Sequence, residues 1–150
     1  MIDQLREELA VDEGCIYKVY LDHLHFKTVG IGHLCREGEP EYDMEVDTPV
    51  SEERVNELFD KDIAWVITDC RKIIPDFDMI PDEVQLILGN MMFNMGINRM
   101  GMFKKFLSAI DDRDWRRAAI EMEDSRWHKQ VTARANRLIH RMENVKKPPL

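Results

Sequence analysis

The pattern of hydrophobic positions in the first third of the chain changes at Gly14. Apolar residues recur at three- and four-residue spacing over residues 2–12, with acidic side chains on the opposite face, and this predicts an amphipathic helix. Residues 16–20 and 26–31 are rich in β-forming side chains and are separated by a short polar turn, which predicts a β-hairpin. Glu13 therefore lies where the helix ends and the hairpin begins.

A second helical pattern begins at Ser51, a good N-cap residue that is followed by two acidic residues. It continues up to a proline and predicts one long helix over about 51–74. Pro81 and Asp82 open a helix that is apolar almost all round, as is typical of the centre of a core. Shorter helical patterns follow over residues 97–110, 112–122, 124–129 and 132–143. Residues 35–50 are turn-rich and acidic, and we expect a third short strand and a loop there.

The chain has 150 residues, enough for one compact domain or for two lobes that share a long element. No stretch approaches the roughly 18 consecutive apolar residues of a membrane span. The first residues read as an acidic amphipathic helix and not as a secretory signal. Cys15, Cys35 and Cys70 are odd in number and lack metal-type spacing, so we expect reduced thiols in a cytosolic product.

The formal net charge of −8 is unevenly distributed. Residues 113–150 hold ten Lys/Arg and five Asp/Glu, a net charge of +5, which leaves −13 for residues 1–112. This acidic balance disfavours nucleic-acid binding. It also gives poor long-range steering towards an anionic polymer. Either the charge serves solubility alone, or the protein works at high ionic strength, where charges are screened.

Several short motifs occur in order along the chain. They are Asp12-Glu13-Gly14, Tyr20-Leu21-Asp22, Thr28-Val29-Gly30-Ile31-Gly32-His33, Phe93-Asn94-Met95-Gly96, Ser125-Arg126-Trp127 and Ala133-Arg134-Ala135-Asn136-Arg137. In order and spacing, the sequence resembles the phage lysozyme family, the endolysin muramidases of the T-even phage type. The motifs span nearly the whole chain, so the resemblance is specific.

The resemblance implies an α+β, mainly α, lysozyme-like fold with two lobes in a single domain over residues 1–150. A small antiparallel β-hairpin lobe would occupy about 14–50, and the connecting helix would occupy about 51–74. The helical lobe would combine residues 1–13 with about 75–150.

The resemblance also assigns catalysis to Glu13, Asp22 and Thr28. Cleavage of a glycosidic bond needs one protonated acid and one ionised carboxylate. Glu13, which follows Val11 beside the apolar helix junction, is expected to be the acid, and Asp22 at the exposed turn is expected to be the ionised partner. The Thr28 hydroxyl would hold the attacking water, which favours an inverting reaction. Taken singly, these residues would be a solvated helix end, a turn former and a strand residue, so the assignment depends on their joint spacing.

Other matched positions have supporting roles. His33 and Asp62 are expected to form a structural ion pair between the hairpin end and the long helix, and Arg134 is expected to orient Glu13. Leu34 and Phe93 match substrate-binding positions, although either would also suit a plain core residue. A metal site formed by Asp22 with the neighbouring His23 and His25 lacks an evident third strong ligand, so we expect no metal and no cofactor.

For this family the expected reaction is hydrolysis of the β-1,4 bond between N-acetylmuramic acid and N-acetylglucosamine in bacterial peptidoglycan, leading to host cell lysis. We expect a monomer that does not insert into membranes and moves from the host cytoplasm to the periplasm with the help of a holin. Two alternatives stay open: a lytic transglycosylase on the same fold, and a non-catalytic protein that binds cell wall or forms part of a phage particle.

Overall fold

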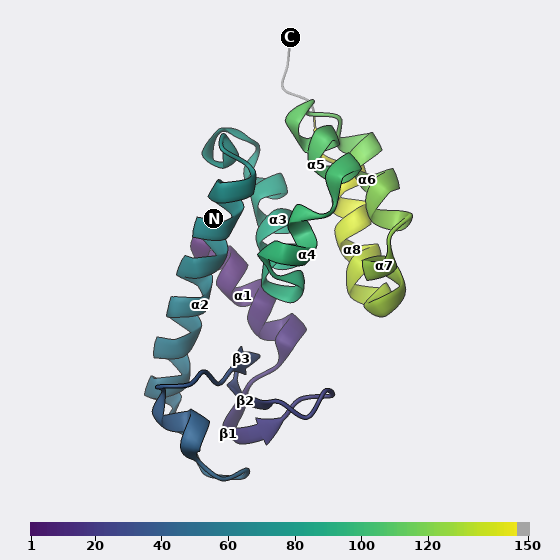
Figure 1. Ribbon diagram of the computed structural model, residues 1–150. Coiled ribbons are helices and arrows are strands. Elements are labelled where there is room, and N and C mark those ends of the chain that lie inside the picture. The colour runs from purple at the N-terminus through teal and green to yellow at the C-terminus, as the bar shows by residue number, and fades with distance from the viewer. Residues whose placement is uncertain (147–150) are drawn as a thin grey trace. The chain divides into compact units, whose positions relative to one another are not determined.

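Helices make up most of the computed structural model, which describes residues 1–146 (Figure 1). The helices are α1 (Ile2–Glu13), α2 (Glu52–Ile73), α3 (Asp82–Met95), α4 (Ile97–Gly101), α5 (Lys104–Asp111), α6 (Trp115–Glu123), α7 (Arg126–Gln130) and α8 (Thr132–Glu143), with short 3-10 helices η1 (Pro40–Asp43) and η2 (Phe77–Met79). A small antiparallel sheet has the order β1 (Ile16–Leu21), β2 (Lys27–Gly30) and β3 (His33–Leu34). The mainly α, α+β fold expected from the sequence is confirmed.

The chain divides into two compact units, Ile2–Trp65 and a second one that comprises Met1 and Val66–Leu150. The boundary between them falls inside α2, so the helix predicted over about 51–74 is confirmed and belongs to both units. Residues 2–13, which were expected in the helical lobe, group with the strands in this division. The boundaries of the two lobes stay a prediction.

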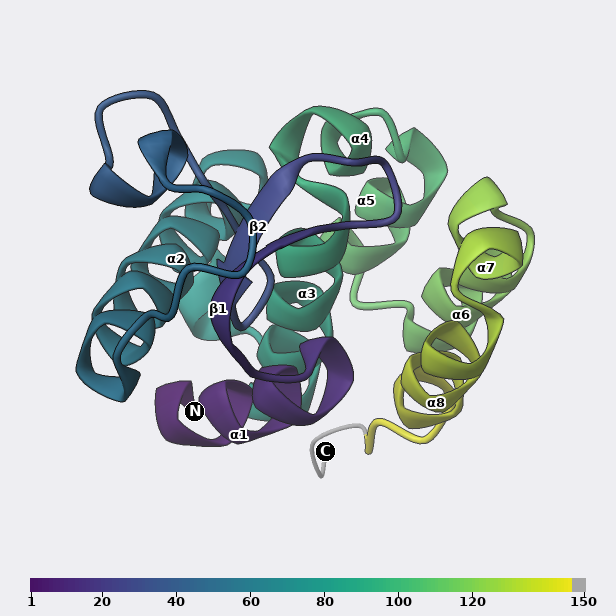
Figure 2. The same ribbon diagram turned by 90° about the horizontal axis from the view of Figure 1, so that it is seen from below.

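In the unit Ile2–Trp65, a left-handed glycine turns the chain from α1 into β1. Gly14 has a φ of +73°, which non-glycine residues rarely adopt, and its N–H donates to the carbonyl of Ala10. The two long strands then pair antiparallel, with Tyr20 opposite Thr28, and the turn between them extends beyond the strands as a narrow loop (Figure 2). Gly30 lies so close to α2 that a Cβ there would meet Cγ1 of Val55 at 2.6 Å. This close approach packs the hairpin against the first turns of α2.

Residues 35–50 differ from the expectation. The third strand is His33–Leu34, before this segment, and the segment itself contains η1 and one isolated bridge, between Lys18 and Pro49. The bridge comes with backbone hydrogen bonds that join Val19 and Tyr17 of β1 to the end of the segment. The segment is therefore held along the free edge of β1, where a strand would otherwise expose unpaired backbone groups.

Hydrogen bonds and ion pairs of side chains also hold residues 35–50 in place. Arg54, in the first turns of α2, makes a two-pronged ion pair with Glu41, which is 2% exposed. The ammonium of Lys27 in β2 donates to the carbonyls of Tyr42 and Met44. A buried carboxylate is tolerated because the bidentate partner and its hydrogen bonds compensate its lost hydration.

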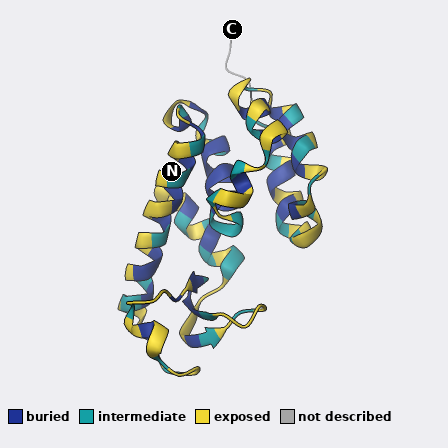
Figure 3. Cartoon of the chain, in the orientation of Figure 1, coloured by how far each residue is buried: buried dark blue, intermediate teal, exposed yellow. Residues whose placement is uncertain are grey.

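The unit that begins at Val66 is built around α3, which is buried along most of its length (Figure 3). This confirms the central helix predicted from the apolar pattern that follows Pro81. The segment 97–110, predicted as one helix, forms two, α4 and α5, because the chain bends after Gly101. α8 packs against α6, α7 and α3, and the Trp127 indole donates to Asn94 of α3 at 2.8 Å.

Candidate active site

The turn between β1 and β2 is organised by the carboxylate of Asp22. Its Oδ1 accepts hydrogen bonds from the backbone N–H groups of Leu24 at 2.8 Å and Phe26 at 2.9 Å. The backbone N–H of Asp22 donates in turn to the carbonyl of Phe26. This is the local hydrogen bonding for which aspartate is favoured in turns. It fixes the direction of the carboxylate and, within residues 1–146, leaves Oδ2 with no hydrogen-bond partner from the chain.

Thr28 lies close to Asp22 because both bond the same carbonyl group. The Thr28 hydroxyl donates to the carbonyl of Phe26 at 3.0 Å, and Thr28 is only 4% exposed. With its proton used in this way, the hydroxyl oxygen keeps lone pairs that can accept a hydrogen bond from water. Leu34 is the Cα partner of Thr28 across the sheet and is 50% exposed. An exposed leucine beside a catalytic candidate suits contact with a bound substrate.

Glu13, at the end of α1, lies within electrostatic reach of the hairpin. Burial raises the pKa of the Tyr20 phenol, and the negative charges of Glu13 and Asp22 raise this pKa further. A hydrogen bond with the backbone of Gly32 acts on the pKa of Tyr20 in the opposite direction. The charges of both carboxylates therefore act on the pKa of one phenol, and Tyr20 is the Cα partner of Thr28 in the sheet.

One detail of the sequence interpretation of Glu13 is wrong. We expected Val11 to contribute to apolar surroundings for this carboxyl group, but Val11 is 82% exposed. Residues 11 and 13 of a helix lie on different faces, because neighbours along a helix surface are three or four positions apart. The charge of Glu13 acts on the half-buried Tyr20, whose pKa it raises.

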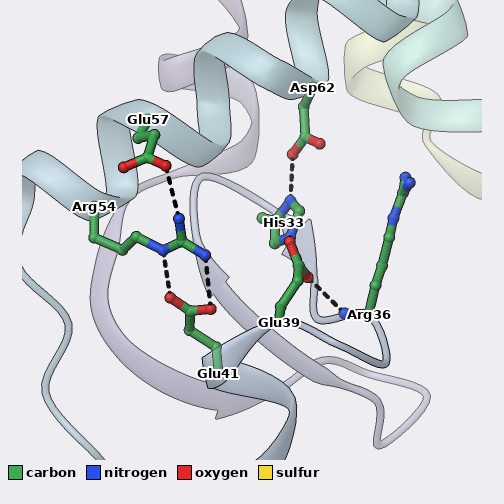
Figure 4. Close-up of polar contacts among 7 residues, drawn as sticks. All are labelled: His33, Arg36, Glu39, Glu41, Arg54, Glu57 and Asp62. Atoms are coloured by element: carbon green, nitrogen blue, oxygen red, sulfur yellow. Dashed lines mark hydrogen bonds and ion pairs between the residues drawn. The ribbon is translucent and has the colours of Figure 1, made fainter.

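His33 joins β3 to α2, as the motif comparison predicted, and it has a second acidic partner that the sequence did not reveal (Figure 4). Its Nδ1 lies 2.7 Å from Oδ2 of Asp62, and its Nε2 lies 3.0 Å from both carboxylate oxygens of Glu39. Burial lowers the pKa of His33, but the hydrogen bonds with Asp62 and Glu39 outweigh burial, and the pKa is raised above its usual value. Glu39 also accepts from the backbone N–H of Arg36.

Arg134 and Phe93 belong to the other unit. Arg134, in α8, donates from Nε to the side-chain oxygen of the buried Asn90 in α3 at 2.8 Å. Phe93 lies on α3, half-buried. The expected contact of Arg134 with Glu13 and the expected contact of Phe93 with substrate stay predictions.

Sequence reasoning missed Tyr20 and Glu39. Tyr20 stood inside one of the quoted motifs but was interpreted only as a β-forming residue. Glu39 lies in the acidic segment 35–50, where nothing in the pattern separates it from its acidic neighbours. For the turn His23–His25, the described residues 1–146 include no group of three or more possible metal-ligating side chains. No helix among these residues is long and apolar enough to cross a membrane.

Comparison with known proteins identifies relatives. A protein-family model described as phage lysozyme matches residues 10–144. A Dictyostelium discoideum protein named probable T4-type lysozyme 2 is 29% identical over 93% of this chain and 93% of its own length. A second protein of that organism, named probable T4-type lysozyme 1, is 28% identical over 95% of each chain. The pre-baseplate central spike protein Gp5 of enterobacteria phage T4 is 31% identical over 89% of this chain, which corresponds to 26% of Gp5.

Proposed function

Because this chain belongs to the phage lysozyme family and is therefore a muramidase-type peptidoglycan hydrolase, we propose that it cleaves the β-1,4 bond between N-acetylmuramic acid and N-acetylglucosamine with Glu13, Asp22 and Thr28. The observation that carries the proposal is the position of Tyr20. The negative charges of both Glu13 and Asp22 raise the pKa of its phenol, and Tyr20 is the Cα partner of Thr28 in the sheet, which supports a common site for the three side chains.

The roles follow from the contacts of each group. Glu13 donates its proton to the oxygen that leaves as the carbon–oxygen bond breaks. Asp22, held by two backbone N–H groups through Oδ1, uses Oδ2 to take a proton from the attacking water. The Thr28 hydroxyl, which donates to Phe26, accepts a hydrogen bond from the same water and so orients it. Water attacks the anomeric carbon from the face opposite the leaving group, and the configuration inverts.

Other residues support this chemistry in the proposal. His33, Asp62 and Glu39 hold the end of the hairpin to α2 and keep Thr28 and Leu34 in place. Leu34 contacts the sugar chain. Arg134 orients Glu13, and Phe93 contacts the glycan from the other unit. We further propose that the protein acts as a monomer, is made in the host cytoplasm and reaches the periplasmic wall through a holin.

The proposal is tested by Glu13→Gln, with Glu7→Gln as the matched control on an exposed position of α1. The glutamine keeps the shape of the side chain but cannot donate the proton, so we expect lysis of peptidoglycan to fall by at least about 100-fold, the scale of general acid catalysis. The control should lyse at the wild-type rate. Circular dichroism and the unfolding midpoint of both variants should match the wild type. Full activity in Glu13→Gln would refute the assignment.

A further inference from the structure

Three side chains form a row across the small sheet of the unit Ile2–Trp65. Tyr20 of β1 is the Cα partner of Thr28 in β2, and Thr28 is the Cα partner of Leu34 in β3. Side chains of directly opposite residues lie on the same face of a sheet, so the row Tyr20–Thr28–Leu34 occupies one face. Asp22 comes two positions after Tyr20, and its N–H is still paired with the carbonyl of Phe26. Asp22 therefore belongs to the same face.

The opposite face of the sheet is buried. It carries Val19, Val29 and His33, of which none is more than 5% exposed, and the imidazole of His33 binds α2 from this face. The row on the other face reaches the surface, since Leu34 is 50% exposed and Tyr20 is half-buried. A ligand can therefore approach the sheet from the side of the row.

The hydroxyl group of Tyr20 has a partner for its oxygen but none for its proton. Its oxygen accepts a hydrogen bond from the backbone N–H of Gly32, which acts to lower the pKa of the phenol. Within residues 1–146, no carbonyl or side chain accepts a hydrogen bond from this hydroxyl. A tyrosine hydroxyl can both donate and accept, so its proton stays available to a ligand on this face.

The surroundings of Tyr20 keep its hydroxyl protonated. Burial raises the pKa of the phenol, and the charges of Glu13 and Asp22 raise it further, with a smaller effect from Cys15. Together these effects outweigh the hydrogen bond with Gly32. A neutral phenol donates a hydrogen bond and a phenolate does not. Tyr20 therefore presents a neutral donor beside Asp22 and Thr28.

We propose that Tyr20 is a substrate-binding residue, which donates its hydroxyl proton to an oxygen of the sugar on which Asp22 and Thr28 act. This inference rests on the proposed function, because that function brings a glycan to this face of the sheet. A sugar has oxygens that accept hydrogen bonds and a ring face of C–H groups. The aromatic ring of Tyr20 and the exposed Leu34 suit the ring face, and the hydroxyl suits the oxygens. Thr28, between them, then lies beneath the bound sugar.

The test is Tyr20→Phe, assayed on soluble glycan chains of the cell wall by the release of reducing ends. Phenylalanine keeps the ring and removes the hydroxyl, so KM should rise about 3–10-fold, the loss of one uncharged hydrogen bond, while kcat stays within about twofold. Tyr17→Phe is the matched control, because it removes the other hydroxyl of β1 from a position outside the row. It should keep the wild-type KM.

Binding without cleavage separates this contact from the chemistry. In Glu13→Gln, the affinity for the same glycan in calorimetry should fall about 3–10-fold when Tyr20→Phe is added. Unchanged KM and affinity would overturn the proposal, even with a lower unfolding midpoint, because the hydroxyl would then serve only to hold Gly32. A fall in kcat with unchanged KM would also overturn it, because Tyr20 would then act on the carboxylates and not on the sugar. Full activity in Glu13→Gln would overturn the proposed function alone, since the KM of Tyr20→Phe is measured in a protein that keeps Glu13.

Discussion

Glu39→Gln should destabilise the protein in a pH-dependent way, because Glu39 is one of the two carboxylates that hold His33. The pKa of His33 is raised from 6.5, so its interactions contribute fully below that pH and are lost as pH rises through the raised value. Burial raises the pKa of Glu39, but the hydrogen bond with His33 outweighs burial and lowers this pKa below 4.5. The stabilisation from Glu39 is therefore present above 4.5 and is lost as pH falls through the lowered value. The charged forms of His33 and Glu39 therefore both contribute to stability between pH 4.5 and pH 6.5.

The size of the effect follows from the contacts. A hydrogen bond to a charged group contributes about 1.5–3 kcal/mol, and a glutamine amide keeps part of it as a neutral acceptor. The side chains of His33 and Glu39 are only 6% and 19% exposed, so solvent screens the pair little. We expect a loss of about 1–2 kcal/mol near pH 5.5, which is a fall in Tm of about 2–8 °C for a chain of this length.

Thermal unfolding of the wild type and Glu39→Gln should be measured side by side near pH 5.5 and near pH 9.5. The difference in Tm should be largest at the lower pH and should shrink at the higher pH, where His33 loses its proton. Glu37→Gln, an exposed carboxylate two residues away, is the control and should change Tm little at either pH. An equal loss of Tm in Glu39→Gln at both pH values would refute the argument, because it would mean that the charge of His33 plays no part.

Three further predictions concern the glycine contact, the thiols and the net charge. Gly30→Ala should lower the free energy of unfolding, measured in urea, by about 2–4 kcal/mol, because φ is +64° and the new Cβ would meet Val55 at 2.6 Å. Gly101→Ala is the control and should not lower this free energy, because a Cβ there would meet no atom within 4 Å. Similar losses in both variants would contradict the reasoning. A thiol reagent should label Cys15 alone in the folded protein, because burial raises the pKa of Cys35 to about 11 and that of Cys70 to about 12. Rapid labelling of the variant Cys15→Ser would contradict this prediction, because it would mean that Cys35 or Cys70 reacts in the folded protein. If the acidic charge reflects work at high ionic strength, lysis should rise with added salt, and best activity at low salt would exclude that explanation.

The sequence pattern predicts α2, α3 and the β1–β2 hairpin well, because the structure of these elements depends on residues that are close in sequence. The helix over about 51–74 is Glu52–Ile73, because Ser51 caps its first turn and apolar residues then recur at helical spacing. α3 was predicted from its apolar character on every side. The hairpin followed from its β-forming runs and polar turn. In these places neighbouring residues carry enough information to fix the backbone.

The rest depends on contacts between distant residues. Residues 35–50 have no periodic pattern, and their path is fixed by Arg54 on Glu41, by Lys27 on two carbonyls and by the edge of β1. The second partner of His33 came from this segment and could not be predicted for the same reason. Arg134 and Asn90 are 44 residues apart in sequence, and their contact appears only in the folded unit. Motif spacing predicts catalytic roles for Glu13, Asp22 and Thr28, and these roles stay a prediction; the spacing does not show how the turn holds Asp22.

The most direct test of hydrolysis by Glu13, Asp22 and Thr28 is mass spectrometry of the fragments released from purified peptidoglycan in heavy-oxygen water. Attack by water held on Asp22 and Thr28 predicts reducing muramic ends that carry the heavy oxygen. Anhydro-muramic ends without label would contradict this account and indicate transglycosylation with Glu13 acting alone. Absence of released fragments would instead indicate a protein that binds the wall without cleaving it.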